Sequence, residues 1–184
     1  MDNVAIVLFA GGAASRFPGK LEHPIDGRPM LARCFDRLRA SDCKVYLAAR
    51  GSFSPELDAQ LDAPVIVDRH PGAGPLRALL DACAVIRAER IFAVAADQPN
   101  VDARLIACMT AAWREGDEAL VPQHDGKIEP LAAAYDRRAA LREGFELRSS
   151  PKHGVRDLVA RLRARFVECP GDYFHNVNRP EDLP

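Results

Sequence analysis

The feature that most constrains the fold is the six-residue apolar run Val4–Phe9, which leads directly into Ala10-Gly11-Gly12. A strand with one face in water alternates apolar and polar residues, whereas a continuous apolar run predicts a strand that is buried on both faces. Such strands are typical of parallel sheets with helices on either side. The run therefore predicts an α/β domain in which a glycine-containing loop follows the first strand.

The rest of the chain alternates short apolar strands with amphipathic helices. Further strands are predicted over residues 45–49, 64–67, 91–96, 119–122, 130–135 and 166–169. A short helix is predicted over residues 55–61, and longer helices are predicted where apolar residues recur at helical spacing from Leu31, Leu76, Leu105 and Val155. Pro130 predicts that its strand lies near a sheet edge. We therefore expect residues 1–184 to form one three-layer, Rossmann-like domain with a mainly parallel, mixed sheet.

The composition excludes several classes of protein. The net charge is −1 over 184 residues, so no overall field attracts nucleic acid or a membrane, and we expect neither as a partner. The five cysteines are scattered without a Cys-x-x-Cys pair, which favours reduced thiols. No positively charged segment precedes the first apolar run, so we expect no leader, and no apolar stretch has membrane-spanning length. We expect a cytoplasmic protein that is a monomer or a weak homo-oligomer.

The loop "AGGAASRFPGK", which runs from Ala10 to Lys20, has the chemistry of an anion site. Gly11 and Gly12 allow backbone N–H groups to approach a ligand closely, and Arg16 and Lys20 add two cations. Amides and cations together suit a triphosphate. The loop matches neither the G-x-G-x-x-G dinucleotide motif nor the Walker motif. The alternative is a surface turn with two solvated cations.

Asp97 follows the apolar strand 91–96 at the edge where α/β sheets bind ligands. Mg²⁺ takes one or two carboxylates, several waters and phosphate oxygens, so Asp97 is a candidate metal ligand. The alternative is a cap for the following helix, a role for which Asp102 is better placed.

Asp68 and two asparagines are weaker candidates. Asp68 ends its strand as Asp97 does, and it is suited to a sugar hydroxyl, a base edge or the metal, with a helix or turn cap as the alternative. Asn176 and Asn178 flank Val177, so an extended segment would point both amides to one side. The alternative for them is a turn before Pro180.

The histidines and the serines give no catalytic signal. No histidine pair has metal-ligand spacing, and we expect surface positions for His23, His124, His153 and His175, with His70 solvated in its loop. No Gly-x-Ser-x-Gly motif is present, so hydrolase chemistry with a serine nucleophile has little support.

Together, these residues resemble the nucleotidyltransferases of the molybdenum cofactor guanylyltransferase type. The resemblance covers nearly the whole chain and is carried by Ala10-Gly11-Gly12 with Arg16 and Lys20, Gly74-Pro75-Leu76, Asp97-x-Pro99, Pro130-Leu131 and Asn176-Val177-Asn178-x-Pro180-Glu181-Asp182-Leu183. It implies the fold of nucleotide-diphospho-sugar transferases. It also implies transfer of GMP from GTP to a molybdopterin-type cofactor, with release of pyrophosphate and with Mg²⁺ as cofactor.

The resemblance also implies roles for individual residues. The nucleotide would be bound by Ala10, Gly11, Gly12, Arg16, Lys20, Asp68, Gly74 and Pro75. Arg16, Lys20 and Asp97 would be catalytic, with Asp97 holding Mg²⁺, and Asn176 and Asn178 would bind the acceptor. Because the acceptor phosphate is already a nucleophile, the reaction needs in-line positioning and charge neutralisation rather than a strong base.

The sequence departs from the family in two places. The loop from Arg16 to Lys20 is shorter than usual and has Pro18 where glycine is expected, and Ala48-Ala49-Arg50 lacks a common asparagine. The base and the acceptor therefore stay open. The first alternative is a cytidylyl- or other NTP transferase that acts on another phosphorylated cofactor or a sugar phosphate. The alternative from another class is a non-catalytic, nucleotide-binding accessory protein.

Overall fold

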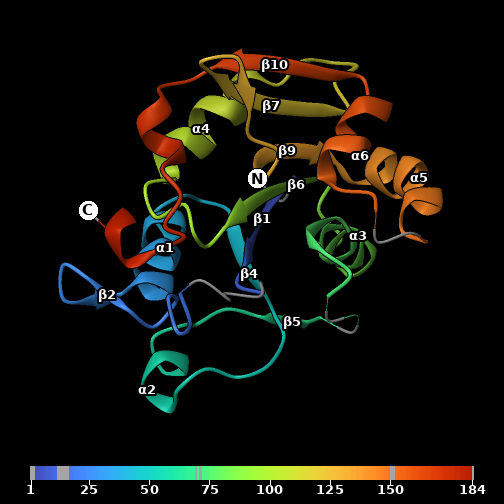
Figure 1. The fold of residues 1–184 in the computed structure, drawn as a ribbon. Coiled ribbons are helices and arrows are strands. Elements are labelled where there is room, and N and C mark those ends of the chain that lie inside the picture. The colour runs from blue at the N-terminus through green and yellow to red at the C-terminus, as the bar shows by residue number, and fades with distance from the viewer. Residues whose placement is uncertain (1–2, 12–16, 69, 71, 150–151, 184) are drawn as a thin grey trace.

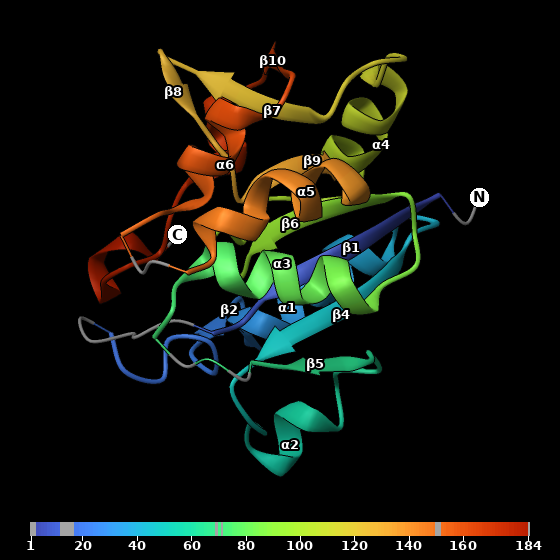
Figure 2. The same cartoon turned by 90° about the vertical axis from the view of Figure 1, so that its right-hand side faces the viewer.

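The chain folds into three layers, a central sheet with helices on both faces (Figures 1 and 2). The computed structural model describes residues 3–11, 17–68, 70, 72–149 and 152–183. One face is covered by α1 (Met30–Arg39) and α4 (Ala103–Ala112), and the other by α3 (Pro75–Val85), α5 (Arg137–Leu147) and α6 (Val155–Arg161). The one-turn helix α2 (Pro55–Asp58) lies beyond β5 at one end of the sheet (Figure 1). Among the described residues, no helix has the length and apolar character needed to cross a bilayer.

The sheet is mixed but mainly parallel, as the sequence predicts. Its strand order is β10-β7-β9-β6-β1-β4-β5, with β8 paired to β7. The strands are β1 (Val4–Phe9), β4 (Lys44–Ala49), β5 (Val65–Val67), β6 (Arg90–Ala95), β7 (Ala119–His124), β8 (Lys127–Ile128), β9 (Ala132–Asp136) and β10 (Ala164–Glu168). Strands β5, β4, β1 and β6 are parallel, whereas β9 is antiparallel to both β6 and β7.

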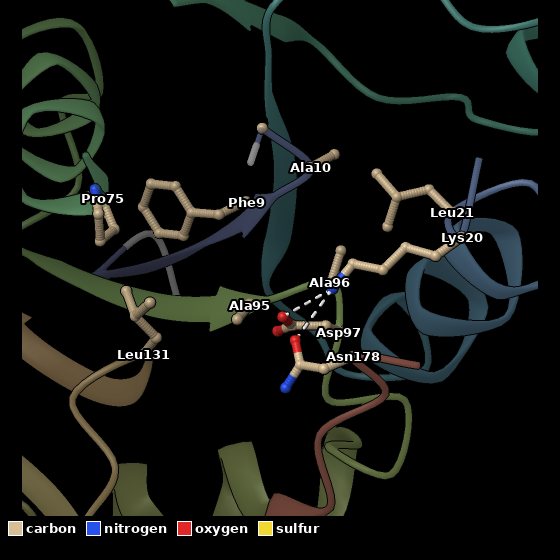
Figure 3. A pocket seen from close by; sticks show the side chains of 11 residues that line it. Phe9, Ala10, Lys20, Leu21, Pro75, Ala95, Ala96, Asp97, Leu131 and Asn178 are labelled. Atoms are coloured by element: carbon tan, nitrogen blue, oxygen red, sulfur yellow. Dashed lines mark hydrogen bonds and ion pairs between the residues drawn. The ribbon is translucent and has the colours of Figure 1, made fainter. Parts of the chain in front are cut away.

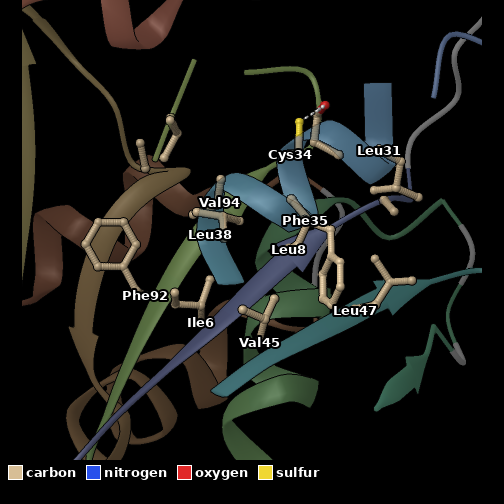
Figure 4. Close-up of a cluster of buried hydrophobic side chains, with 14 of the residues drawn as sticks. Ile6, Leu8, Leu31, Cys34, Phe35, Leu38, Val45, Leu47, Phe92 and Val94 are labelled. Carbon is tan, nitrogen blue, oxygen red and sulfur yellow. Dashed lines mark hydrogen bonds between the residues drawn. The ribbon is translucent and has the colours of Figure 1, made fainter. Parts of the chain in front are cut away.

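Burial of both faces of β1 accounts for its continuous apolar sequence. Ile6 and Leu8 belong to the cluster with α1 and α4, while Ala5, Val7 and Phe9 belong to the cluster with α3, α5 and α6. Figure 4 shows the first cluster, in which side chains of α1 pack onto β1 and β6. Full burial of an aliphatic side chain contributes roughly 1.5–3 kcal/mol, so the two clusters hold the central strand firmly from either side.

Local sequence signals fix where two of these helices begin. Gly74, with φ of 84°, precedes α3, and Pro75 occupies the first turn, where its missing N–H costs nothing. Asp102 caps α4, because its carboxylate accepts hydrogen bonds from the N–H groups of Arg104 and Leu105. The prediction that Asp102 is the better cap is therefore confirmed.

The strand that follows Pro130 is not at a sheet edge, so that prediction was wrong. β9 pairs with β6 on one side and with β7 on the other. Pro130 lies before the first paired residue, Ala132, and therefore removes no hydrogen bond from the ladder. Its carbonyl instead accepts a hydrogen bond of 2.6 Å from the Tyr135 hydroxyl.

Several elements were not predicted. These are the short hairpin β2 (Pro24–Ile25) and β3 (Arg28–Pro29), strand β8, helix α5, and the 3₁₀ turns Gly171–Phe174 and Pro180–Asp182. The helix predicted over residues 55–61 is only the single turn α2. In α5, Gly144 lies so close to the Leu80 side chain that an added Cβ would clash with it. This close approach explains why a poor helix former lies inside a helix.

The strand order reverses between β1 and β6. From β1 the chain passes to β4 and β5 on one side of the sheet, and then crosses to β6 on the other. Ligands of such sheets bind beyond the carboxyl ends of the strands at this reversal. Phe9 is paired with Ala95, so the residues after β1 and β6 leave the sheet at the same edge.

Candidate functional site

A pocket of about 280 Å³ lies beyond the carboxyl ends of β1 and β6 (Figure 3). It is lined by Phe9, Ala10, Gly11, Lys20, Leu21, Pro75, Ala95, Ala96, Asp97, Leu131 and Asn178. Most of its wall is apolar, and its polar groups come from three distant parts of the chain. This is the composition expected of a small-molecule site, in which a few polar groups orient a ligand.

Lys20, Asp97 and Asn178 meet in this pocket (Figure 3). The Lys20 Nζ donates to Asp97 Oδ2 at 3.0 Å and to Asn178 Oδ1 at 3.5 Å. It also donates to the Val177 carbonyl at 3.1 Å. The pocket therefore contains a cation within hydrogen-bond reach of both a carboxylate and an amide.

Backbone contacts hold these groups in place. The Lys20 N–H donates to the carbonyl of Phe17, whose buried side chain anchors the end of the first loop in the core. The Val177 side chain is fully buried, and its N–H donates to the Asp97 carbonyl at 2.8 Å. The carboxyl-terminal segment is thus fixed beside the end of β6.

A second hollow of about 260 Å³ adjoins the first and shares Phe9, Gly11 and Pro75 with it. Its polar side chains are Arg50 and Asp68, whose Nε and Oδ2 atoms are 3.9 Å apart. The other side-chain oxygen of Asp68 accepts a hydrogen bond of 2.9 Å from the His70 N–H. Asp68 therefore caps its turn and also lines a pocket, so the two roles considered for it are compatible. No signal in the sequence marked Arg50 as part of this hollow.

The structure brings most of the other site candidates to the same edge. Ala10 and Gly11 line the first pocket, and Gly74 lines the second, at the start of α3. Gly12 and Arg16 lie outside the described residues. The first turn of α3 presents its N-terminus to this edge, which favours an anionic ligand.

Asn176 is placed differently from Asn178. Its side-chain Nδ2 donates to the Phe174 carbonyl at 3.2 Å, and it does not line the pocket that Asn178 lines. The sequence predicts that both amides point to one side of an extended segment, whereas the two side chains have different partners, Phe174 for Asn176 and Lys20 for Asn178. A role for Asn176 in binding the acceptor stays a prediction.

A polar network that the sequence did not reveal lies next to Asp97. The Gln98 amide donates to Glu129 Oε2 at 3.1 Å, and the other oxygen of Glu129 lies 3.1 Å from His124 Nε2. The His124 ring stacks on Phe174 at a centroid distance of 5.1 Å. The expectation that His124 is a surface residue was therefore wrong, because its ring is enclosed by the carboxyl-terminal segment. His23 is also half-buried, against the ring of Phe17.

The cysteine nearest the site is not a nucleophile. The Cys34 Sγ donates to the Ala96 carbonyl at 3.5 Å. Burial, followed by the charge of Asp97, raises the pKa of the Cys34 thiol to about 12. The thiol therefore stays protonated at neutral pH, and its role is packing.

Comparison with known proteins gives a consistent result. A family model described as "MobA-like NTP transferase domain" matches residues 6–166. A probable molybdenum cofactor guanylyltransferase from Bacillus cereus (strain AH820) is 24% identical over 190 residues, which cover 99% of this chain and 94% of that protein.

Solved structures of low sequence identity share the fold. Molybdopterin-guanine dinucleotide biosynthesis protein A from Archaeoglobus fulgidus superposes with a TM-score of 0.78 at 23% identity, over 97% of this chain and 94% of that one. A cytidylyltransferase from Leptospira borgpetersenii superposes with the same TM-score, 0.78, at 18% identity, over 98% of this chain and 83% of that one. The fold is therefore shared by proteins named for different bases.

Proposed function

The chain belongs to the MobA-like NTP transferase family, and from this premise we propose that it transfers GMP from GTP to a molybdopterin-type cofactor. A phosphate oxygen of the acceptor attacks the α-phosphorus of GTP, the bond from that phosphorus to the α–β bridging oxygen breaks, and pyrophosphate leaves. The observation that carries the proposal is the meeting of Lys20, Asp97 and Asn178 in one pocket. The name of the Bacillus relative, a probable molybdenum cofactor guanylyltransferase, supports the choice of base and acceptor.

The nucleotide would lie across the two adjoining hollows. Its phosphates would face Lys20 and the backbone of Ala10 and Gly11, with the α3 N-terminus at Gly74 and Pro75 on the same side. Sequence position alone adds Gly12 and Arg16 to this set. The base would lie in the second hollow, where the guanidinium of Arg50 is suited to the O6 and N7 atoms of guanine.

Asp97 would hold Mg²⁺. It is the one carboxylate among the described residues that line the first pocket, and the described residues contain no group of three or more histidines, cysteines, aspartates and glutamates suited to a metal. A single carboxylate with water and phosphate oxygens is a usual environment for Mg²⁺, so the donor set fits. The bound ion would neutralise charge on the phosphates, while Lys20 binds them and Asn178 orients the acceptor. Sequence position alone adds Asn176 to the residues that would bind the acceptor.

The test is an assay of pyrophosphate release with a molybdopterin acceptor, Mg²⁺ and each NTP in turn. We expect release with GTP, and the Asp97→Asn variant serves as the inactive control. Release with CTP but not GTP would replace the proposal by a cytidylyltransferase. NTP binding without release from any NTP would instead indicate an accessory protein. A thermal-shift series with GTP, CTP, ATP and UTP shows which nucleotide the protein binds, because a bound ligand raises the melting temperature.

A further inference from the structure

The Lys20 ammonium is fully engaged inside the pocket. It has three N–H donors, and three oxygens lie within hydrogen-bond reach: Asp97 Oδ2, the Val177 carbonyl and Asn178 Oδ1 (Figure 3). Only 13% of the Lys20 side chain is exposed, against 27% for Asp97. The lysine therefore occupies a specific position rather than sampling solvent.

The three oxygens resemble the ligands of a hard cation. Carboxylate, backbone carbonyl and side-chain amide oxygens are the donors that such ions take from proteins. Two features hold the residues that carry them side by side without the lysine: the Val177 N–H donates to the Asp97 carbonyl, and the Val177 side chain is fully buried. The fold thus brings the three residues together, and the ammonium lies among their oxygens.

A divalent ion and the ammonium exclude each other at this position. Two cations within a few ångströms repel, and the ammonium already holds one of the two Asp97 side-chain oxygens, the Val177 carbonyl and Asn178 Oδ1. A triphosphate offers the lysine a stronger set of anionic acceptors close by. The flexible four-carbon stem of lysine lets the ammonium move to those acceptors without a backbone change.

We propose that Lys20 is a built-in cation that occupies the metal position at Asp97 until nucleotide phosphates draw it away, so that the divalent ion enters only with the nucleotide. This inference rests on the proposed function for the identity of the ligand. It assigns Lys20 a second task, which is to keep the empty pocket neutral and free of metal.

The test measures Mn²⁺ binding to the nucleotide-free protein, by the loss of the EPR signal of free Mn²⁺. We expect weak binding to the wild-type protein and about tenfold or more tighter binding to Lys20→Met, because a neighbouring opposite charge changes the affinity of a carboxylate for a cation by about that factor. The gain should disappear in the double variant Lys20→Met with Asp97→Asn. Lys127→Met, which removes an exposed lysine from β8, is the matched control and should bind as the wild type does.

Two further variants separate the effect of the lysine charge from an effect on folding. Lys20→Arg retains a cation and should show no gain in Mn²⁺ affinity. Lys20→Gln removes the charge but keeps a donor, and it should show the gain even where Lys20→Met fails to fold. Equal Mn²⁺ affinity for the wild type and the uncharged variants would overturn the proposal. Because the measurement contains neither nucleotide nor acceptor, a failure of the GTP assay leaves its outcome unaffected.

Discussion

Two carboxylates with cationic partners lie at opposite ends of the sheet. Asp97 follows β6 at its carboxyl end and lines the pocket. Glu118 precedes β7 at the other end, where its backbone carbonyl accepts a hydrogen bond from Asp136, the residue opposite the start of β6. The two clusters are built from the same chemical groups, but they differ in how completely the chain satisfies the carboxylate.

Glu118 has every partner that a carboxylate needs. One oxygen accepts from the Arg163 N–H at 2.9 Å, and the other accepts from Arg142 Nη2 at 2.8 Å and lies 3.2 Å from Arg163 Nη2. These contacts, led by the Arg163 N–H, lower the pKa of Glu118. With 11% of its side chain exposed, the group is a structural tie between β7, α5 and the start of β10.

Asp97 keeps capacity for a ligand. Among the described residues its side chain has one hydrogen-bond partner, Lys20, and that partner is on a flexible stem. We therefore interpret Glu118 as a carboxylate that stabilises the fold, and we propose that Asp97, at the ligand edge of the sheet, is available for chemistry. The comparison therefore predicts opposite effects of neutralising the two residues.

The largest effect is expected from Asp97→Asn. Turnover should fall by about 100-fold or more, as it does when one preorganised electrostatic group is removed from an active site. The melting temperature should stay close to that of the wild type, because a partly exposed ion pair contributes only about 0–1 kcal/mol. Pyrophosphate release and thermal unfolding measure the two quantities, and GTP affinity should be largely retained. Undiminished turnover would contradict a metal role for Asp97.

Glu118→Gln should give the reverse result. The variant leaves two guanidinium groups facing a neutral amide, which should cost about 1–3 kcal/mol of unfolding free energy. In a chain of this size each kcal/mol corresponds to about 2–4 °C in melting temperature. Glu143→Gln is the control, because the Glu143 carboxylate pairs with Nε of the exposed Arg142 side chain, and its loss should lower the melting temperature much less. Specific activity should be unchanged in both variants, and a Glu118→Gln protein that is stable but inactive would invalidate the comparison.

The sequence predicted those parts of the fold that local pattern determines. Strand β1 was predicted from its continuous run of apolar residues, and helix α3 from apolar residues at helical spacing. Both patterns can be recognised within a short stretch of sequence. Helix α5 was missed because its interface is built on alanines and on Gly144, which is required by close packing and not by helix propensity. The interior position of β9 depends on strand pairing between distant segments, which no local pattern records.

The candidate site was predicted in its residue types but not in its contacts. Lys20 and Asp97 are 77 positions apart, and Lys20 and Val177 are 157 apart, so their meeting is a property of the fold. The strand-end rule was enough to choose Asp97, because all parallel strands deliver their carboxyl ends to one edge. The rule applies equally to Arg50, which directly follows β4, but Arg50 was not predicted and became a candidate through the hollow that it lines.

The pH dependence of stability provides a sharper test of the comparison. The folded-state pKa of Glu118 lies below its ordinary value of 4.5, so the unfolded chain takes up the proton first as the pH falls. The stabilisation that Glu118 contributes is therefore complete above its unfolded pKa, and it is lost as the pH falls through the folded pKa. Urea unfolding at pH 7 should give a higher free energy of unfolding for the wild type than for Glu118→Gln, and the difference should shrink as the pH falls below 4.5. A difference that is constant with pH would mean that the glutamate acts by packing and not by charge.

The smallest effect is expected from a third carboxylate that combines features of the other two. Both oxygens of Glu129 have partners, as those of Glu118 have, but here both partners are side chains, and one of them, Gln98, directly follows Asp97. Glu129→Gln should weaken the tie to Gln98 and loosen the position of Asp97, which lowers kcat by roughly tenfold or less while the KM for GTP stays constant. Steady-state kinetics measures this split, and His124→Gln, which removes the other partner of Glu129, is the matched variant. If only the melting temperature changes and kcat is preserved, Glu129 is a structural residue like Glu118. The residues that affect turnover would then be limited to those that line the pocket.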